Sequence, residues 1–403
     1  MSTPPRRHDL IVVGGGIYGV CVALESARRG LQPLLLERHG FGGATSVNHQ
    51  RIIHGGLRYL QSLDVKRTLE SAAEQRWFQR HFPDLVTPLS CLMPLYGPGW
   101  RSPWALRGAF AVYGLLTGNR GAGRVLSSAE TCGVFPGVRR AGLKGAAMWR
   151  EAVMVNSHKL LSELLGWAVA CGATAQDNRP VERLIVEDGK TRGVESGGSQ
   201  FHADVVVNCA GPWSRVLAAT LDRDIPRLMH PSLGFCVLVN HTPLSSAALA
   251  VARAEPGSRT YFLVPWRGRV LVGTGHAAWS GALDHPAPTE AQLRELLDDV
   301  HAAIPSFLAT PEHVAHVFCG ILPAARADSP ETAARPVVAE HARYGGPSGL
   351  WSVSGVKYTT ARRVAEQLVR DIFGNRPYRA NTDRPATSDR DIPPIPAEAA
   401  LQT

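Results

Sequence analysis

The sequence has no run of apolar residues long enough to cross a membrane. A membrane-spanning helix needs about 20 predominantly apolar residues, and charged or glycine-rich stretches interrupt every apolar run before that length. Arg6 and Arg7 lead into a glycine-rich strand and turn instead of the apolar core of a signal peptide. We therefore expect a cytoplasmic protein.

Cysteine is also scarce. The 403 residues include seven cysteines, an odd number, and no CxxC pair. This pattern argues against a disulfide framework and a zinc site, and it favours a reducing compartment. We predict no metal site.

Basic residues exceed acidic ones, yet they form no long run. The formal net charge is +9, from 43 Lys and Arg against 34 Asp and Glu. The cations are dispersed and lack the clustering that is typical of nucleic-acid-binding proteins. We predict no nucleic-acid partner, because a small anionic ligand accounts for the charge more simply.

Glycine is abundant, and one group of glycines opens the first βαβ unit. Residues 9–13 and 34–36 are apolar runs typical of buried parallel strands, and residues 20–29 form a helical stretch. Gly14, Gly16 and Gly19 lie between the first strand and the helix. They allow a tight turn, a close approach of backbone to a pyrophosphate, and close packing of helix on strand. Glu37 ends the second strand, where an acid accepts hydrogen bonds from a ribose, so the unit predicts a dinucleotide site.

Further elements follow along the chain. We predict helices at 65–78, 158–171, 289–303 and 358–373, and strands at 181–186, 191–195, 204–207 and 350–353. Strand patterns between residues 235 and 273 indicate an antiparallel sheet. Residues 375–403 are rich in Pro, Asp, Arg and Ala without apolar periodicity, which predicts a disordered tail.

A second glycine corner favours FAD over NAD. Residues 354–360 combine a strand end, Gly355, Lys357 and a helix start, far from the first corner. A nicotinamide site is usually completed within one contiguous domain, so the distant corner favours the longer flavin coenzyme. A helix N-terminus beside Lys357 would stabilise the electron-rich edge of a reduced flavin. The alternative is a solvated lysine at a helix start.

Several motifs resemble those of one protein family. They are residues 14–19, 44–46, 53–60, 210–213, 264–266, 273–274 and 357–360, of which 53–60 is the most specific. Together they resemble the FAD-dependent glycerol-3-phosphate dehydrogenases, within the D-amino-acid-oxidase-like flavoprotein superfamily. The likeness covers most of the chain.

The resemblance implies an α/β fold (α+β overall), with a Rossmann-like FAD-binding domain and an antiparallel β-sheet substrate or cap domain. Residues 1–80, 150–225 and 320–374 would form the FAD-binding domain. Residues 81–149 and 226–319 would form the cap domain, with the substrate between its sheet and the flavin.

The resemblance and the glycine corners together assign the candidate site residues. The cofactor-binding candidates are Gly14, Gly16, Ile17, Tyr18, Gly19, Glu37, Arg38, Thr45, Ser46, Arg51, Val181, Gly211, Gly355, Lys357, Tyr358 and Thr359. The candidates that border the substrate and act in catalysis are His54, Arg58, Tyr59 and His276.

Two positions depart from the family pattern. Leu322 stands where the family has an arginine that grips the anionic substrate, and an apolar side chain cannot pair with a phosphate. Thr274-Gly275-His276 replaces a Thr-Thr-Asp sequence. We therefore predict that the substrate is not glycerol 3-phosphate itself.

The catalytic candidates have ordinary alternatives. His54 and His276 are base candidates because imidazole titrates near physiological pH, but each could be a packed core histidine. Arg58 could hold a carboxylate or phosphate bidentately, or pair with Glu70 or Asp64 on the surface.

The leading hypothesis is oxidation of a small anionic hydroxy compound by hydride transfer to flavin N5. The alternatives are an FAD-dependent amine or amino-acid oxidase, a non-catalytic flavoprotein subunit and an NAD-dependent enzyme. The electron acceptor would be O₂ or quinone. Residues 98–116 have the composition of an interfacial helix that could contact a membrane, although we favour an ordinary covering helix.

Overall fold

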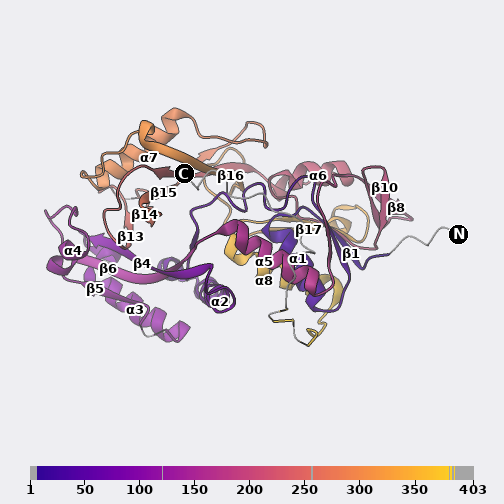
Figure 1. Ribbon diagram of the computed structural model, residues 1–403, viewed down its shortest axis with the longest axis horizontal. Coiled ribbons are helices and arrows are strands. Elements are labelled where there is room, and N and C mark those ends of the chain that lie inside the picture. Colours follow the sequence, from indigo (N-terminus) through magenta and orange to yellow (C-terminus); the bar gives the residue numbers. More distant parts are fainter. Residues whose placement is uncertain (1–6, 120, 256, 381, 384, 386–403) are drawn as a thin grey trace.

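The computed structural model describes residues 7–385 except 120, 256, 381 and 384, and two large sheets organise these residues (Figure 1). The first sheet has six strands in the order β17-β18-β11-β1-β2-β7. Its strands are β17 (Val337–Glu340), β18 (Leu350–Ser354), β11 (Val206–Asn208), β1 (Leu10–Val13), β2 (Pro33–Leu36) and β7 (Thr174–Gln176). Neighbouring strands are parallel except β17, so strands from both ends of the chain lie side by side, as in a Rossmann-like domain.

Three helices share one face of this sheet. They are α1 (Ile17–Arg28), α5 (Ser157–Ala170) and α8 (Ala361–Phe373), and they lie together in Figure 1. Their apolar side chains form one core with those of β1 and β2. α1 is buried along almost its whole length because its small residues let both other helices approach closely. α6 (Ser214–Leu221) lies on the other side.

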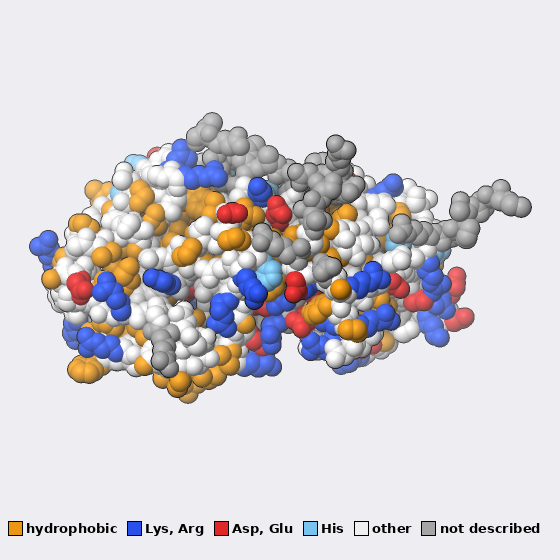
Figure 2. All heavy atoms as spheres, turned by 60° about the horizontal axis from the view of Figure 1, so that its bottom comes forward, with side chains coloured by type: hydrophobic (Ala, Val, Ile, Leu, Met, Phe, Trp, Pro, Cys, Tyr) orange, Lys and Arg blue, Asp and Glu red, His pale blue; other side chains and the backbone are white. Residues whose placement is uncertain are grey.

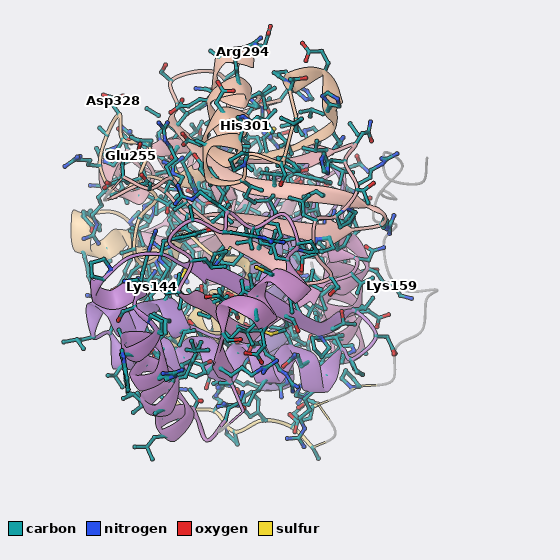
Figure 3. The ribbon with its side chains drawn as sticks, turned by 90° about the vertical axis from the view of Figure 1, so that its left-hand side faces the viewer. Lys144, Lys159, Glu255, Arg294, His301 and Asp328 are labelled. Atoms are coloured by element: carbon teal, nitrogen blue, oxygen red, sulfur yellow. The ribbon has the colours of Figure 1, made fainter. Side chains whose placement is uncertain are left out.

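The second sheet, called the cap sheet below, is larger and mostly antiparallel. Its strand order is β16-β12-β15-β14-β13-β4-β6-β3, with β5 on β6. Its strands are β16 (Val314–Pro323), β12 (Pro231–Val239), β15 (Arg269–Ala278), β14 (Tyr261–Trp266), β13 (Ala248–Val251), β4 (Val86–Leu95), β6 (Gly145–Met154), β3 (Ile52–Ile53) and β5 (Gly123–Leu126). Figure 3 views this sheet from its own end of the molecule, with α7 (Glu290–Ala303), which carries Arg294 and His301, above the strands. α7 packs on them through Leu296, Leu297 and Val300.

The chain passes more than once between the two sheets. β3, β6 and β16 all belong to the cap sheet, although the predicted FAD-binding segments include β3 and parts of the other two. Edge-to-edge pairing decides their place, and the residue pattern of a single strand carries no information on its partner. The domain limits stay a prediction.

Two smaller features complete the fold. β8 (Val181–Glu187), β9 (Lys190–Ser196) and β10 (Ser199–His202) form an antiparallel sheet. α2 (Val65–His81), α4 (Ser128–Val134) and α3 (Pro103–Thr117) cover the cap side. α3 buries Leu106 and Phe110 and exposes Trp104 and Leu115, so it covers the sheet with one face and presents an apolar outer face. Among the described residues, every helix is too short or too polar to cross a membrane.

The first part of the predicted disordered tail contacts the rest of the molecule. Tyr378 packs against Arg28 and Arg29 of α1, and its hydroxyl donates to Glu25 at 2.6 Å. Aromatic and charged contacts with α1 order this segment without any apolar periodicity of its own. Residues 386–403 of the predicted tail lie outside the described residues.

Candidate active site

The first glycine turn has the tight geometry that its sequence predicts. Gly14 has φ of 106°, and a Cβ there would lie 2.6 Å from the carbonyl oxygen of Cys209 on the neighbouring strand end. A Cβ on Gly19 would lie 1.8 Å from the carbonyl oxygen of Gly14. Larger residues at these two positions would push α1 off β1.

The N-terminus of α1 is suited to an anion. The N-cap is Gly16, which has no side chain to cap the helix, and the first turn contains no acidic residue. Ser46 accepts a hydrogen bond from the Ile17 N–H at 2.9 Å. The helix dipole and the backbone N–H groups of this turn therefore fit a pyrophosphate.

Glu37 lies beside this turn at the end of β2. Its carboxylate accepts hydrogen bonds from the N–H groups of Gly15 at 2.6 Å and His39 at 3.0 Å. An ionised carboxylate has about four acceptor positions, so capacity remains for ribose hydroxyls. Val181 is half-buried against the apolar core of β1 and β2. Gly211 follows β11, and a Cβ there would meet no atom within 4 Å, so the space beside it is open.

Tyr18 joins the two glycine corners. Its hydroxyl donates to the carbonyl oxygen of Lys357 at 2.9 Å and accepts from the Val356 N–H at 3.2 Å. A Cβ on Gly355 would lie 2.0 Å from the Tyr18 ring, so only glycine permits this approach. The two corners, distant in the sequence, are therefore in direct contact.

Lys357 and Arg58 bring positive charge to the second corner. The Lys357 ammonium lies 4.5 Å from the centre of the Tyr59 ring. Burial, reinforced by the charge of Arg58, lowers the pKa of Lys357 to about 8. Thr359 follows in the 3₁₀ turn Tyr358–Thr360 that begins α8, and the buried Tyr358 hydroxyl has no partner among the described residues.

His276 lies on the cap sheet near the same cations. It pairs with Gly234 across β12 and β15, and a Cβ on Gly234 would meet both Leu322 at 2.9 Å and the His276 ring at 3.6 Å. Burial, with the charges of Arg259 and Arg58 nearby, lowers the pKa of His276 to about 4. Its Nδ1 is buried and has no partner among the described residues. His276 is therefore neutral near pH 7.

His54 lies at the end of β3 beside a buried acid. Its Nδ1 is 3.5 Å from Oε1 of Glu151, and its ring packs against Phe262 at 5.4 Å between centres. Half of the His54 side chain is exposed. The motif that contains His54, Arg58 and Tyr59 thus reaches both the cap sheet and the second glycine corner.

Three cofactor candidates take positions that the sequence did not indicate. Thr45 donates to the Ile321 carbonyl of β16 at 3.1 Å. Arg38 stacks on Trp213 at 4.0 Å and pairs with Asp284 of the cap at 2.9 Å. Arg51 is 1% exposed, and its guanidinium lies near Trp266 and Phe318 and donates to Ser157. Any contact of Arg51 with the cofactor would therefore come from its backbone.

Glu151 and Gln50 are two further residues of this region that the sequence did not indicate. Gln50 donates to the carbonyl oxygens of Phe262 and Gly273 and so attaches the segment before β3 to two cap strands. Glu151 is a buried acid in β6. The pair Arg150-Glu151 in an otherwise apolar strand sequence is the signal that could have indicated it.

The comparisons with known proteins identify the family. The model of the FAD dependent oxidoreductase family (DAO) matches residues 9–370. A glycerol-3-phosphate dehydrogenase of Synechocystis sp. is 27% identical, over 91% of this chain and 70% of that protein. Glycerol-3-phosphate dehydrogenase 2 of Mycobacterium tuberculosis is 29% identical, over 90% of this chain and 63% of that protein. The chain thus spans roughly two thirds of the length of these relatives.

Solved structures share the fold. The crystal structure of glycerol-3-phosphate dehydrogenase from Bacillus halodurans, complexed with FAD, matches with a TM-score of 0.70 and 24% identity, over 94% of this chain and 68% of that one. Glycine oxidase from Geobacillus kaustophilus matches with a TM-score of 0.66 and 18% identity, over 94% and 98% of the two chains. The dinucleotide is therefore a flavin and not a nicotinamide, which fits the anion-ready turn at Gly16 and the joined glycine corners. The chain belongs to the family of FAD dependent oxidoreductases, and its cofactor is FAD.

Proposed function

We propose that this protein oxidises a small anionic hydroxy compound other than glycerol 3-phosphate. The observation that carries the proposal is the contact of Lys357 with the segment that contains Arg58: the Lys357 ammonium lies 4.5 Å from the centre of the Tyr59 ring. The charge of Arg58 also contributes to the lowered pKa values of Lys357 and His276. These groups come from three distant parts of the chain, and Arg58 and Lys357 give the region between the cap sheet and the second glycine corner a positive charge. Other Lys and Arg side chains are dispersed over the surface, as on the face that Figure 2 shows.

The cofactor residues follow from the same arrangement. Gly14, Gly16 and the N-terminus of α1 would hold the pyrophosphate, and Glu37 the ribose. Gly355, Lys357 and Thr359 would meet the pyrimidine edge of the flavin. Bound FAD supplies the acceptor for a hydride.

The two candidate bases differ in suitability. General-base catalysis is most efficient when the pKa of the base is near the working pH, and the pKa of His276, about 4, makes it a poor acceptor of a proton at neutral pH. His54 is half-exposed and lies beside an acid. We assign His54 as the base that takes the hydroxyl proton, and Arg58 as the cation that holds the anionic group. His276 contributes a neutral hydrogen-bond acceptor.

Leu322 bears on the choice of substrate. Its side chain lies beside Gly234 and His276, so the wall that would carry a cation in the related dehydrogenases is apolar and neutral here. Because this wall offers no cation, a singly charged carboxylate is better matched than a doubly charged phosphate. The same wall would also accept an amino acid, which keeps an amine or amino-acid oxidase as the second candidate.

We propose a cytoplasmic location and O₂ or a quinone as the electron acceptor. All seven cysteines are free, which favours a cytoplasmic location. Electrons would pass from the flavin to O₂ or to a quinone. Reoxidation of the reduced enzyme by air or by a soluble quinone would distinguish these acceptors.

The test is anaerobic bleaching of the yellow protein with hydroxy acids, sugar and glycerol phosphates, phosphonates and amino acids. We expect one hydroxy class to bleach wild type, and Arg58→Ala to slow bleaching by about 10- to 150-fold because a charge-assisted bidentate contact contributes about 1.5–3 kcal/mol. FAD should remain bound. Arg76→Ala, which removes a surface arginine bonded to the Thr117 carbonyl, is the matched control. Wild-type bleaching rates in Arg58→Ala would overturn the pocket assignment, and preferential bleaching by amines would select the second candidate.

A further inference from the structure

Glu151 is a buried carboxylate that four donors surround. Its side chain is 5% exposed. Oε2 accepts hydrogen bonds from the Gly55 N–H at 2.6 Å and from Gln75 Nε2 at 2.9 Å. Oε1 accepts from Trp149 Nε1 at 3.0 Å and faces His54 Nδ1 at 3.5 Å. Hydrogen bonds to both oxygens hold this carboxylate in one orientation.

The same network holds the backbone on both sides of His54. Gln75 Nε2 also donates to the Ile53 carbonyl at 2.7 Å, and the Tyr113 hydroxyl donates to the Gly55 carbonyl at 2.7 Å. Ile53 of β3 pairs with Ala152, the residue after Glu151 in β6. The imidazole therefore projects from a fixed backbone towards a fixed carboxylate.

This geometry selects one tautomer of His54. A carboxylate only accepts, so the ring nitrogen that faces Glu151, Nδ1, carries the proton, and Nε2 of the neutral ring is the acceptor. The His54 side chain is 48% exposed while Glu151 is buried, so the open edge of the ring is the one away from the acid. Nε2 is then the atom available to a ligand.

We infer that Glu151 is a positioning residue for His54. It holds the proton on Nδ1, so that Nε2 takes the substrate proton as the hydroxyl O–H bond breaks, and it stabilises the imidazolium that results. The inference rests on the proposed function, in which His54 is the base. Glu151 does not itself touch the substrate.

The decisive variant is Glu151→Gln. Neither the Gly55 N–H nor the Trp149 indole N–H can reverse, and Gly55 makes the shorter bond, so the glutamine keeps its oxygen at Gly55, loses the bond to Trp149 and directs its NH₂ group at His54 Nδ1. That nitrogen must then accept, which moves the ring proton to Nε2. We expect flavin reduction at saturating substrate to slow by about 10- to 100-fold, part of what a general base contributes, while substrate Kd and FAD content change little.

A double-mutant cycle separates positioning from a structural effect. In a His54→Gln background, Glu151→Gln should cause no further loss of rate, because Glu151 acts only through the imidazole. Glu74→Gln is the matched control. Glu74 is another buried acid, 1% exposed, whose partner is Arg362 of α8, and its loss should leave the rate of flavin reduction unchanged.

Nitrogen-15 NMR of the histidine rings gives a readout that needs no substrate. The His54 signals, identified by their loss in His54→Gln, should show a protonated Nδ1 in wild type and a protonated Nε2 in Glu151→Gln. If no donor bleaches the flavin, the proposed function fails while the tautomer still tests this inference. An unchanged tautomer, a wild-type reduction rate, or an equal loss in both backgrounds would overturn it.

Discussion

Lys357 places a positive charge in a partly buried site, and this charge lowers the stability of the folded chain by an amount that depends on pH. Its pKa in the folded chain is about 8, against an ordinary value of 10.5. Between these values the unfolded chain binds the proton more firmly, so the stability of the FAD-free protein rises as pH rises from about 8 to 10.5. Below pH 8 the charged ammonium destabilises that protein by up to ~3 kcal/mol.

Lys357→Met should therefore stabilise the FAD-free protein at neutral pH, and the gain should shrink as pH rises through that window. The same variant should make the flavin harder to reduce, because the electron-rich edge of the reduced ring loses its cation. Chemical unfolding at two pH values and a redox titration of the FAD-bound protein measure the two effects. Lys159→Met, at an exposed position on α5, is the control. Equal destabilisation by Lys357→Met at both pH values would contradict this account.

At the scale of elements, the contact between α1 and the Ser354–Thr360 segment holds the two halves of the cofactor site together. This contact requires glycine at position 355, because the Tyr18 ring occupies the space that a side chain there would need. Gly355→Ala should displace that ring and weaken FAD binding by at least about tenfold, since overpacking of this kind costs about 1–3 kcal/mol.

Tyr18→Phe distinguishes the ring from its hydroxyl. It keeps the packing but loses the hydrogen bonds to the second corner, so we expect a smaller loss of FAD affinity, corresponding to about 1 kcal/mol. Flavin release measured by fluorescence provides both numbers. The interpretation fails if Tyr18→Phe releases FAD more readily than Gly355→Ala does.

At the scale of the whole molecule, the residues after α8 return to α1 and bury its charged end. Arg28 bonds to Asp383 and Thr382, and Arg29 bonds to Tyr378 and the Arg376 carbonyl. These arginines and Glu25 are buried. Without this segment, the buried side chains of Glu25, Arg28 and Arg29 would each lose a hydrogen-bond or ion-pair partner.

Truncation after Gly374 should lower Tm by several degrees, because buried charges lose their partners. Truncation after Pro385, which keeps every one of these contacts, is the matched control. Thermal unfolding of the FAD-bound forms measures the difference. Equal melting temperatures for the two truncated proteins would show that the segment contributes no stability.

Much of the fold was predictable because its signals are local. The helices at residues 65–81 and 157–170 follow the apolar periodicity, and the first βαβ unit follows the glycine spacing. The place of β3, β6 and β16 in the cap sheet was not predictable, since pairing depends on distant partners. The contacts of residues 375–380 with α1 were not predictable either, because charged and aromatic contacts leave no periodic pattern in the sequence.

The sequence by itself determined the dinucleotide turn, the family and the cofactor, because glycine conformation and helix starts depend on a few neighbouring residues. Only the tertiary structure decided which side chains meet. It placed Arg58 near both Lys357 and His276, turned Arg51 into the core, and set Glu151 beside His54. The physical reason is that charge, burial and hydrogen bonding act through space, between segments whose order along the chain says nothing of their distance.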